Sequence, residues 1–347
     1  MFFVAMRHEC FILTPDPRPL TPLKMIHFEK LRAGEKMHIT SRLLAAAVCL
    51  VFLWTGSAQT VDLRPAKAAA LVSRNIRPYA EAVESMGAVF AESPGRELKV
   101  FYLDRFPGKD RAALSGELTE GKFRLFISVG PEATRFVWTD EVSKSSAKLY
   151  SVVLDPEKVL GTAHTPCGIS LNIPAQKQLE MIERGLPGVW RVGLLYDPRY
   201  NSDFFKEAAA LASARGIKII PLEVSSKKEI PGVLKDHWGD VDALWLIPDL
   251  TVISESIIKY VIKESLFKAA PVIGYNRFFY ESGAALAFVF NYEELGKQCA
   301  REALKLLSGK ECGKTTPFFH VWINTRVVKK LGIKVVEDYK FPIEVGP

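Results

Sequence analysis

Residues 168–202 read GISLNIPAQKQLEMIERGLPGVWRVGLLYDPRYNS, and this stretch decides the fold. Its middle part predicts an amphipathic helix, because apolar residues recur there at helical spacing until Pro187 and Gly188 end it. These apolar residues are Leu179, Met181, Ile182 and Leu186. Residues 191–196 form a short apolar run, which is typical of a β-strand covered on both faces. The stretch therefore predicts an extended segment, a helix and a buried strand, joining two parts of the chain that we expect to be built alike.

Strand and helix patterns alternate on both sides of this stretch. Before it, we expect strands at 68–72, 98–103, 125–129 and 148–154, with helices at 76–86, at 110–120 and after Pro131. After it, we expect strands at 217–224, 243–247, 284–290 and 318–323, and helices at 204–214, 228–238, 254–269, 292–307 and 325–331. We expect Gly87 to end the first helix and residues 200–203 to form a loop. Such alternation implies an α/β protein with parallel sheets that carry helices on both faces.

The composition indicates a globular protein of two domains. The chain has 347 residues, of which 48% are hydrophobic and 24% charged, so it can bury a sizeable core. Its formal net charge is +7, but the charges are scattered and form no dense basic stripe. This pattern gives nucleic-acid binding little support.

The first 58 residues resemble an export signal. Residues 43–54 are apolar, follow Arg42 and precede Gly56 and Ala58, two small residues that suit cleavage by signal peptidase. We therefore expect cleavage near Ala58, with Met37 as the natural start. A membrane anchor fits less well, because the apolar run is too short to span a bilayer comfortably.

Cysteine usage does not indicate a metal site. Three of the five cysteines follow the expected cleavage site, and none has metal-type or Cys-x-x-Cys spacing. The five are Cys10, Cys49, Cys167, Cys299 and Cys312. A Cys299–Cys312 disulfide is conceivable in an oxidising compartment, but we favour unpaired and mostly buried thiols.

Polar residues recur where the predicted strands end. In parallel α/β sheets, ligands bind outside the carboxyl ends of the strands. The corresponding loops are 73–75, 130–134, 155–156, 196–202, 248–249 and 275–279. Each of them is also explained by ordinary turn chemistry, and it is their recurrence in both halves that favours a binding site.

Several stretches together resemble the extracytoplasmic substrate-binding proteins of ABC transporters, in the branch that includes tryptophan- and other aromatic-amino-acid-binding lipoproteins. They follow the family order from about residue 129 to 333. The stretches are GPEAT at 130–134, LDPEKVLG at 154–161, CGIS at 167–170, QLEMIE at 178–183, RVGLLYDP at 191–198, VDALWLIPD at 241–249, APVIG at 270–274, SGA at 282–284, ELGKQCAREA at 294–303, LSG at 307–309 and INTRVVKKLGI at 323–333. The part from 70 to 120 is shorter than in the family, and Pro131 stands where the family often has Thr.

The resemblance implies a periplasmic-binding-protein type I fold, in which two doubly wound parallel-sheet lobes enclose a ligand cleft. Three crossovers would join the lobes, near 170–175, near Asn291 and between Cys312 and His320. The first lobe would comprise residues 59–168 and 292–314. The second would comprise 169–291 and 315–347, and residues 1–58 would form the extension and signal peptide.

The implied function is the capture of a small polar ligand in the periplasm or outside the cell and its delivery to a membrane permease. The protein would act as a monomer, without catalytic activity and without a cofactor. With an amino acid as ligand, its carboxylate would meet the helix starts at Ser73 and 130–134, and Asp249 or Asp155 would pair with its ammonium group. The expected ligand-binding residues are Ser73, Arg74, Gly130, Glu132, Thr134, Asp155, Tyr196, Asn201, Asp249, Tyr275 and Asn276. Arg74 is either an anion clamp or a surface charge.

Two other classes of function are weighed against this one. A ligand sensor that feeds a signalling partner would use the same closure, and the sequence does not separate it from a transport protein. An enzyme is disfavoured, because the chain has no Gly-x-Ser-x-Gly elbow, P-loop or metal-spaced histidine cluster. The ligand itself stays open between an amino acid, a nucleobase, a sugar and an oxyanion.

Overall fold

The computed structural model describes residues 65–139, 143–161, 167–334, 340 and 342–347. All of them belong to one compact unit, Val61–Pro347. This unit contains two β-sheets, one of six strands and one of seven. The expected export signal lies outside the described residues.

The first sheet is parallel throughout, with strand order β11-β5-β4-β3-β1-β2. Its strands are β1 (Ala66–Val72), β2 (Arg96–Tyr102), β3 (Leu125–Val129), β4 (Ala147–Val153), β5 (Gly168–Ser170) and β11 (Lys314–Thr315). The central strands are mostly buried because helices cover both of their faces, and apolar residues dominate them. In β1, for example, Ala68 and Ala70 face one core, whereas Ala69 and Leu71 face the other.

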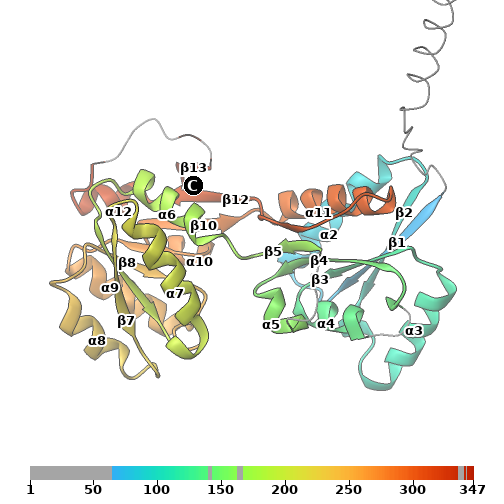
Figure 1. Cartoon of the computed structure of the whole chain (residues 1–347), viewed down its shortest axis with the longest axis horizontal. Coiled ribbons are helices and arrows are strands. Elements are labelled where there is room, and N and C mark those ends of the chain that lie inside the picture. The colour runs from blue at the N-terminus through green and yellow to red at the C-terminus, as the bar shows by residue number, and fades with distance from the viewer. Residues whose placement is uncertain (1–64, 140–142, 162–166, 335–339, 341) are drawn as a thin grey trace, which may run out of the picture. The chain divides into compact units, whose positions relative to one another are not determined.

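Two helices cover one face of this sheet and shorter helices cover the other (Figure 1). The first face carries α2 (Arg77–Ala91) and α11 (Tyr292–Leu307), and the second carries α3 (Arg111–Glu120), α4 (Pro131–Thr139) and α5 (Pro156–Leu160). Two 3-10 turns, Leu103–Arg105 and Gly108–Asp110, precede α3. Helices α2 and α11 approach closely at Gly296, where an added Cβ would lie 2.0 Å from the Ala82 carbonyl oxygen. Glycine is therefore required at this contact.

The second sheet has strand order β13-β12-β10-β9-β8-β6-β7. Its strands are β6 (Arg191–Tyr196), β7 (Lys218–Glu223), β8 (Ala243–Leu246), β9 (Val272–Gly274), β10 (Leu286–Phe290), β12 (Phe319–Ile323) and β13 (Ile343–Val345). Only the β10–β12 pair is antiparallel among the described strands.

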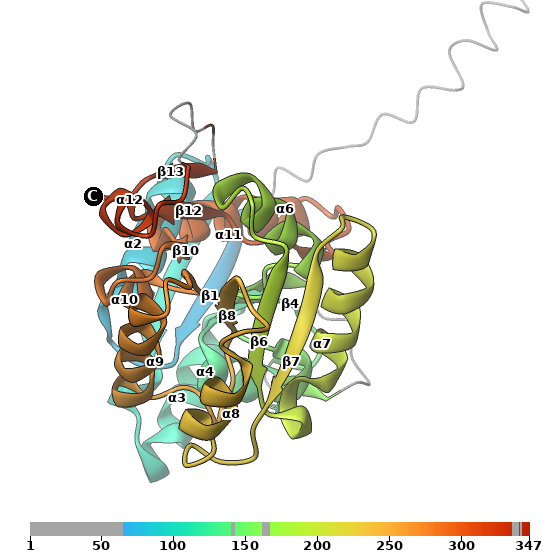
Figure 2. The same cartoon turned by 90° about the vertical axis from the view of Figure 1, so that its left-hand side faces the viewer.

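Helices again cover both faces of this sheet. One core includes residues of α6 (Ala175–Gly185), α7 (Pro198–Ser213) and α12 (Thr325–Lys330). The other includes residues of α8 (Ile230–His237), α9 (Glu255–Phe267) and α10 (Arg277–Glu281). Figure 2 shows α7 and α9 on opposite sides of β6 and β8. The two sheets with their helices confirm the predicted α/β fold class of two doubly wound, mainly parallel sheets.

The chain passes between the two sheets three times. Strand β5 belongs to the first sheet and β6 to the second, β10 to the second and β11 to the first, and β12 again to the second. Strand β5 extends to Ser170 within the first sheet, two residues beyond the boundary expected from the sequence.

One disulfide joins Cys167 to Cys312, and Cys299 is buried and free. The expectation of unpaired thiols was therefore wrong for two of the three cysteines, and the conceivable Cys299–Cys312 pair is not formed. The reason is topological: β5 and β11 are paired neighbours, so residues just before them are brought together across 145 positions of sequence. Sequence spacing alone does not reveal such proximity.

Two local predictions were also wrong. Helix α2 continues past Gly87 to Ala91, because Phe90 packs into the core and extends the buried face. Residues 200–203 belong to α7, which begins at Pro198 and has a kink at Asn201. Asp197 caps this helix by accepting a hydrogen bond from the Arg199 amide, and Pro198 suits its first turn.

Candidate functional site

The strand orders locate one candidate ligand-facing edge on each sheet. When the strands of each sheet are numbered by their order along the chain, the first five lie across the sheet in the order 2-1-3-4-5. The chain therefore moves outward in one direction from the first strand and in the opposite direction from the third strand. Ligands of doubly wound sheets bind at such a switch point, outside the carboxyl ends of the strands. In the first sheet the switch lies between β1 and β3, and in the second between β6 and β8. We call these places the first edge and the second edge.

Ser73 and Gly130 meet at the first edge. Ser73 follows β1 and is buried. Its hydroxyl accepts a hydrogen bond of 2.9 Å from the Ala133 amide and so caps the start of α4. Gly130 follows β3 with φ of +89°, and a Cβ there would lie 2.6 Å from the Ser73 hydroxyl and 2.8 Å from Cζ of Tyr79. Both predicted residues thus shape the edge, but the Ser73 hydroxyl is already engaged with protein groups.

Arg74 and Glu132 form an ion pair at the same edge. The Arg74 guanidinium donates to the Glu132 carboxylate at 2.9 Å, and both side chains are exposed. Partial burial by itself would raise the pKa of Glu132, but hydrogen bonds from its own backbone, Ser73 and Arg74 lower the pKa below its usual range. The edge therefore presents a guanidinium and a carboxylate that compensate each other.

Thr134 and Asp155 are committed to internal contacts. Thr134 is fully buried, and its hydroxyl bonds to the Ser128 hydroxyl and donates to the Gly130 carbonyl. The Asp155 amide donates to the Asn172 side chain, which in turn donates to the Asp155 carboxylate. Asn172 lies in the segment that leads out of the first sheet. The Asp155 carboxylate also pairs with Lys158. Asn172 is a contact that the sequence did not predict. These groups support the edge and do not offer free polar atoms to a ligand.

Two tyrosines that sequence reasoning missed complete the first edge. Tyr79 lies in the first turn of α2, and Tyr292 is the first residue of α11. Both side chains are half-buried, and neither hydroxyl bonds to a residue that the structure describes. The sequence signal for these two tyrosines was their position at the start of a helix that follows a strand. Aromatic residues at such positions are also common in protein cores, so the signal did not identify them.

At the second edge, Asp249 and Asn201, both expected to bind the ligand, bond to each other within a buried network. The Asp249 carboxylate accepts four hydrogen bonds, from the amides of Asp197 (2.9 Å), Thr251 (2.8 Å) and Val252 (3.1 Å) and from the Asn201 side chain (2.6 Å). Its exposed fraction is 1%. These contacts favour the interpretation of Asp249 as a turn acid that ties the loops after β6 and β8.

Asp197 is the second carboxylate of this network, and the sequence did not single it out as a site residue. It accepts hydrogen bonds from Arg199 and, at 2.6 Å, from the Thr251 hydroxyl. Hydrogen bonds from Arg199 are the main reason why its pKa lies well below the usual range, although burial opposes them. Both acids at the second edge therefore already accept hydrogen bonds from protein donors, and Asp197 is also paired with Arg199.

The aromatic and amide residues of the second sheet have separate roles. Tyr196 is buried, stacks on Phe205 and donates its hydroxyl to Glu223, so it is a core residue. Tyr275 is half-buried, and burial, with a smaller effect of the Asp249 carboxylate, raises its pKa to about 12. Asn276 caps α10 through a hydrogen bond from the Phe279 amide. Of these three, Tyr275 is the residue that remains at the edge with a free hydroxyl among the described contacts.

Exposed apolar side chains gather at the strand ends. Eight large hydrophobic residues are exposed in the described part of the chain, and five of them follow the carboxyl end of a strand. These five are Ile76, Leu154, Tyr200, Leu250 and Ile253. Apolar surface at this end of both sheets is typical of a binding face.

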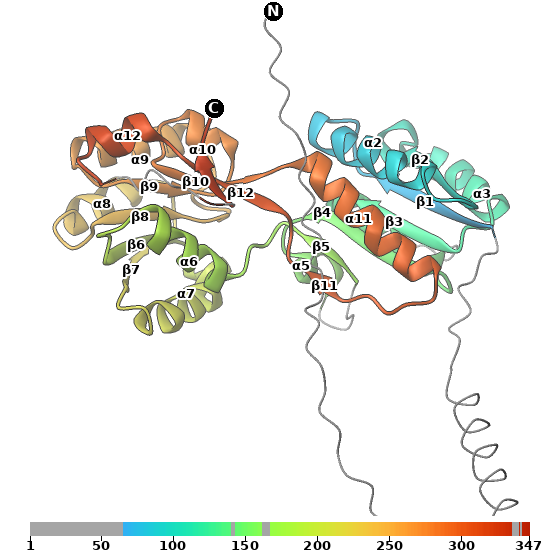
Figure 3. The same cartoon turned by 90° about the horizontal axis from the view of Figure 1, so that it is seen from above.

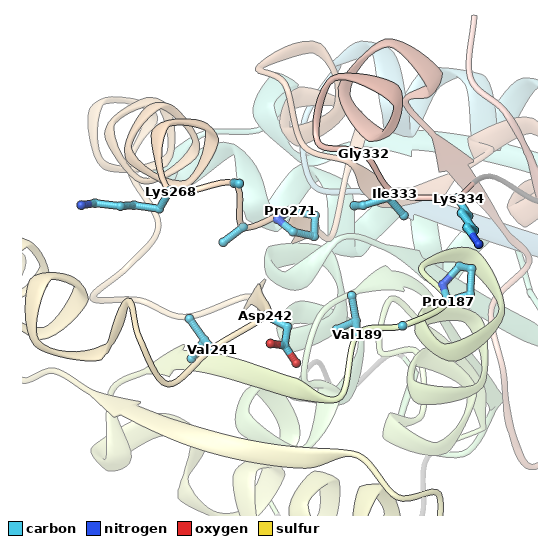
Figure 4. Close-up of a pocket in the computed structure, with 12 residues that line it drawn as sticks. Pro187, Val189, Val241, Asp242, Lys268, Pro271, Gly332, Ile333 and Lys334 are labelled. Atoms are coloured by element: carbon cyan, nitrogen blue, oxygen red, sulfur yellow. The ribbon is translucent and has the colours of Figure 1, made fainter.

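A hollow of about 630 Å³ lies at the other end of the second sheet, where β6, β8 and β9 begin (Figure 4). It is lined by residues 187–189, 241–242, 268–271 and 332–334. Its one carboxylate, Asp242, accepts hydrogen bonds from Arg191 and the Trp190 amide, and Figure 4 shows Lys268 extending away from the other lining residues. The hollow therefore lies at the wrong end of the sheet for a ligand of this fold and offers it no free acid.

Among the residues that the structure describes, no group of three or more His, Cys, Asp or Glu side chains is placed to hold a metal ion. No helix in the same part of the chain is long and apolar enough to cross a membrane.

The two sheets, their strand orders and their three connections define a periplasmic-binding-protein type I fold. Comparison with known proteins places the chain more closely. A family described as ABC transporter substrate binding protein matches residues 158–340, which is more than half of the chain. The protein belongs to this family.

One sequence relative and two solved structures illustrate what the chain is similar to. A tyrosine-binding protein of Clostridioides difficile is 25% identical over 149 residues, which are 42% of this chain and 42% of that protein. The match thus spans less than half of the relative. A ligand-free, open substrate-binding protein with adhesive properties from Clostridium difficile has a TM-score of 0.66 at 18% identity, covering 81% of this chain and all of the other. An ABC domain in complex with L-Trp from Streptococcus pneumonia has a TM-score of 0.52 at 19% identity, covering 78% of this chain and 96% of the other.

Proposed function

We propose that this protein is an extracytoplasmic solute-binding protein that captures a small molecule and delivers it to the permease of an ABC transporter. The observation that carries the proposal is the family match over residues 158–340, on a fold whose strand ends carry exposed apolar and polar side chains. In this proposal residues 59–170 and 292–315 form one lobe and the remainder of the mature chain forms the other. The lobes close on the ligand by rotation about the three connections, and the protein acts as a monomer after cleavage near Ala58.

We further propose an amino acid as the ligand. The tyrosine-binding relative supports this choice, and so does the pairing of apolar surface with hydrogen-bond donors at the first edge. Closure would place the first edge opposite the apolar residues of the second, so that the side chain and the charged end of the ligand meet different surfaces. The ligand would be released unchanged, because the site offers binding groups and no nucleophile–base pair.

A thermal unfolding screen tests this function. The purified protein is scanned with the twenty amino acids, nucleosides, sugars and small anions at millimolar concentration. A ligand present at 100 times its Kd stabilises the folded state by about 2.7 kcal/mol. We expect L-tyrosine, L-tryptophan or L-phenylalanine to raise the melting temperature, and NMR of the recovered ligand to show it unchanged. Stabilisation by none of the amino acids, or conversion of the ligand, would contradict the proposal.

A further inference from the structure

Among the first-edge groups described above, the hydroxyls of Tyr79 and Tyr292 have no hydrogen-bond partner in the described part of the chain. Ser73 is bound to the Ala133 amide, Thr134 to Ser128 and Gly130, and Glu132 to Arg74. Neither hydroxyl is among the buried atoms that lack a partner, so both reach the surface, where a bound ligand can replace water as their partner.

Tyr79 is held at the switch point by packing. Cζ, the ring carbon that carries its hydroxyl, would lie 2.8 Å from a Cβ on Gly130, so the phenol lies directly over the backbone that enters α4. Position 79 is in the first turn of α2, and that helix starts after β1. The hydroxyl is therefore fixed between the ends of β1 and β3, where ligands of this topology bind.

Tyr292 is fixed beside it by the contact of two helices. The Ser85 hydroxyl of α2 donates to the Glu293 carbonyl of α11 at 2.8 Å, and Gly296 lets the two backbones touch. Figure 3 shows α2 and α11 lying side by side over the first sheet. The two tyrosines thus lie on rigid elements, which is the arrangement that gives precise ligand geometry.

The charges around the pair favour neutral donors. Burial, and then the Glu132 carboxylate, raise the pKa of Tyr79, while Arg74 opposes this. Burial, and then the neighbouring Tyr79 and Glu81, raise the pKa of Tyr292. Both phenols therefore keep their protons at neutral pH and act as hydrogen-bond donors.

Two features of the first edge attract an anionic acceptor. The N-cap position of α2, Ile76, offers the first amides of that helix no side-chain acceptor, whereas α11 is already capped by Asn291. The positive end of α2 and the Arg74 guanidinium attract negative charge, and Arg74 offsets the Glu132 carboxylate in part.

We propose that the hydroxyls of Tyr79 and Tyr292 donate hydrogen bonds to the carboxylate of the bound amino acid, an inference that rests on the proposed function above. The two phenols then bind the ligand carboxylate, a role that the sequence analysis had assigned to the hydroxyls of Ser73 and Thr134. The aliphatic or aromatic part of the ligand would lie on the apolar residues of the strand ends.

Isothermal titration of the purified protein with L-tyrosine and with L-tyrosinamide, which lacks the carboxylate, tests the pair. We expect Tyr79→Phe and Tyr292→Phe each to weaken L-tyrosine binding at least tenfold, roughly the loss of one hydrogen bond to a charged group. Binding of L-tyrosinamide should change less than about threefold, because the amide has no carboxylate to lose. L-Tryptophan and its amide form a second pair of probes.

Tyr150→Phe is the matched control. Its hydroxyl is buried and unpaired in the described structure, but its ring lies against Gly168 and Trp138, away from the first edge. This variant should bind like the parent. Wild-type affinity of Tyr79→Phe, or an equal loss of affinity for acid and amide, would overturn the proposal. A parent protein that binds none of the amino-acid probes would instead overturn the proposed function, and with it this inference.

Discussion

The first and second edges occupy equivalent places on two similarly ordered sheets, yet their polar groups are used in different ways. At the second edge, Asp197 and Asp249 are buried and accept hydrogen bonds from two loops. At the first edge, Arg74 and Glu132 pair at the surface and two tyrosine hydroxyls stay unpaired in the described structure. The carboxylates of the second edge thus hold its own loops together and leave one free phenol, that of Tyr275, whereas the first edge retains two phenol donors among the described contacts.

This difference shows that a polar residue after a strand is not by itself a ligand contact. A carboxylate that already accepts four hydrogen bonds has little to gain from an ammonium group, because the new partner would displace existing donors. A free phenol gains its first partner on binding.

The largest effect on the first sheet should come from its disulfide. Replacing Cys167 and Cys312 by Ser opens a loop of 145 residues, and chain entropy puts the loss of unfolding free energy at about 4–5 kcal/mol. Chemical denaturation with and without reductant measures it. The double variant should be insensitive to reductant, whereas Cys299→Ala should keep the parent's sensitivity. A parent protein that reductant does not destabilise would contradict the pairing.

Asp249→Asn should be the most damaging single change at the second edge. The amide nitrogen of the asparagine would replace one carboxylate oxygen, so an N–H donor would face the N–H groups that now donate to that oxygen. We therefore expect a loss of about 2–3 kcal/mol in unfolding free energy. Asp240→Asn, at an exposed acid that pairs only with His237 among described residues, is the control and should stay within about 0.5 kcal/mol. An Asp249→Asn protein that is fully stable but binds ligand tenfold more weakly would return Asp249 to the ligand set.

Gly130→Ala should affect both stability and binding at the first edge. Its φ of +89° strains any residue with a Cβ, and the methyl group would overlap the Ser73 hydroxyl and the Tyr79 ring. We expect a loss of about 1–2 kcal/mol and weaker ligand binding, since Tyr79 must move. Gly161→Ala, also at positive φ but with open space around it, is the control for strain alone and should keep the parent's affinity. Equal affinity in both variants would mean that Tyr79 does not touch the ligand.

The smallest effect should be the pH dependence that Glu132 contributes. Because its folded-state pKa is lowered, the ion pair stabilises the protein above the ordinary pKa of 4.5 and this increment is lost as pH falls below it. The pair is exposed, so Glu132→Gln should cost less than about 0.5 kcal/mol at pH 7, and this cost should shrink as pH falls below 4.5. Denaturant melts at pH 7 and at successively lower pH values compare the variant with the parent. A cost that does not shrink on acidification would indicate a role other than the ion pair.

Much of the fold was predictable, because apolar runs and helical spacing are local properties. Strand β6 and helix α11 were predicted with their observed bounds. The Cys167–Cys312 bridge was not, because it depends on the pairing of β5 with β11 across most of the chain. The candidate site was predicted as a place, the carboxyl ends of the strands, but not as a set of atoms. Nothing in the sequence distinguishes a saturated carboxylate at Asp249 from a free phenol at Tyr79.

Amide hydrogen exchange with and without saturating L-tyrosine tests the central claim most directly. We expect added protection at residues 73–79 and 130–134 and at the start of α11. Residues 187–189 and 268–271, which line the hollow at the other end of the second sheet, should exchange as before. Protection confined to that hollow, or to the loops around Asp249 with none at the first edge, would contradict the account.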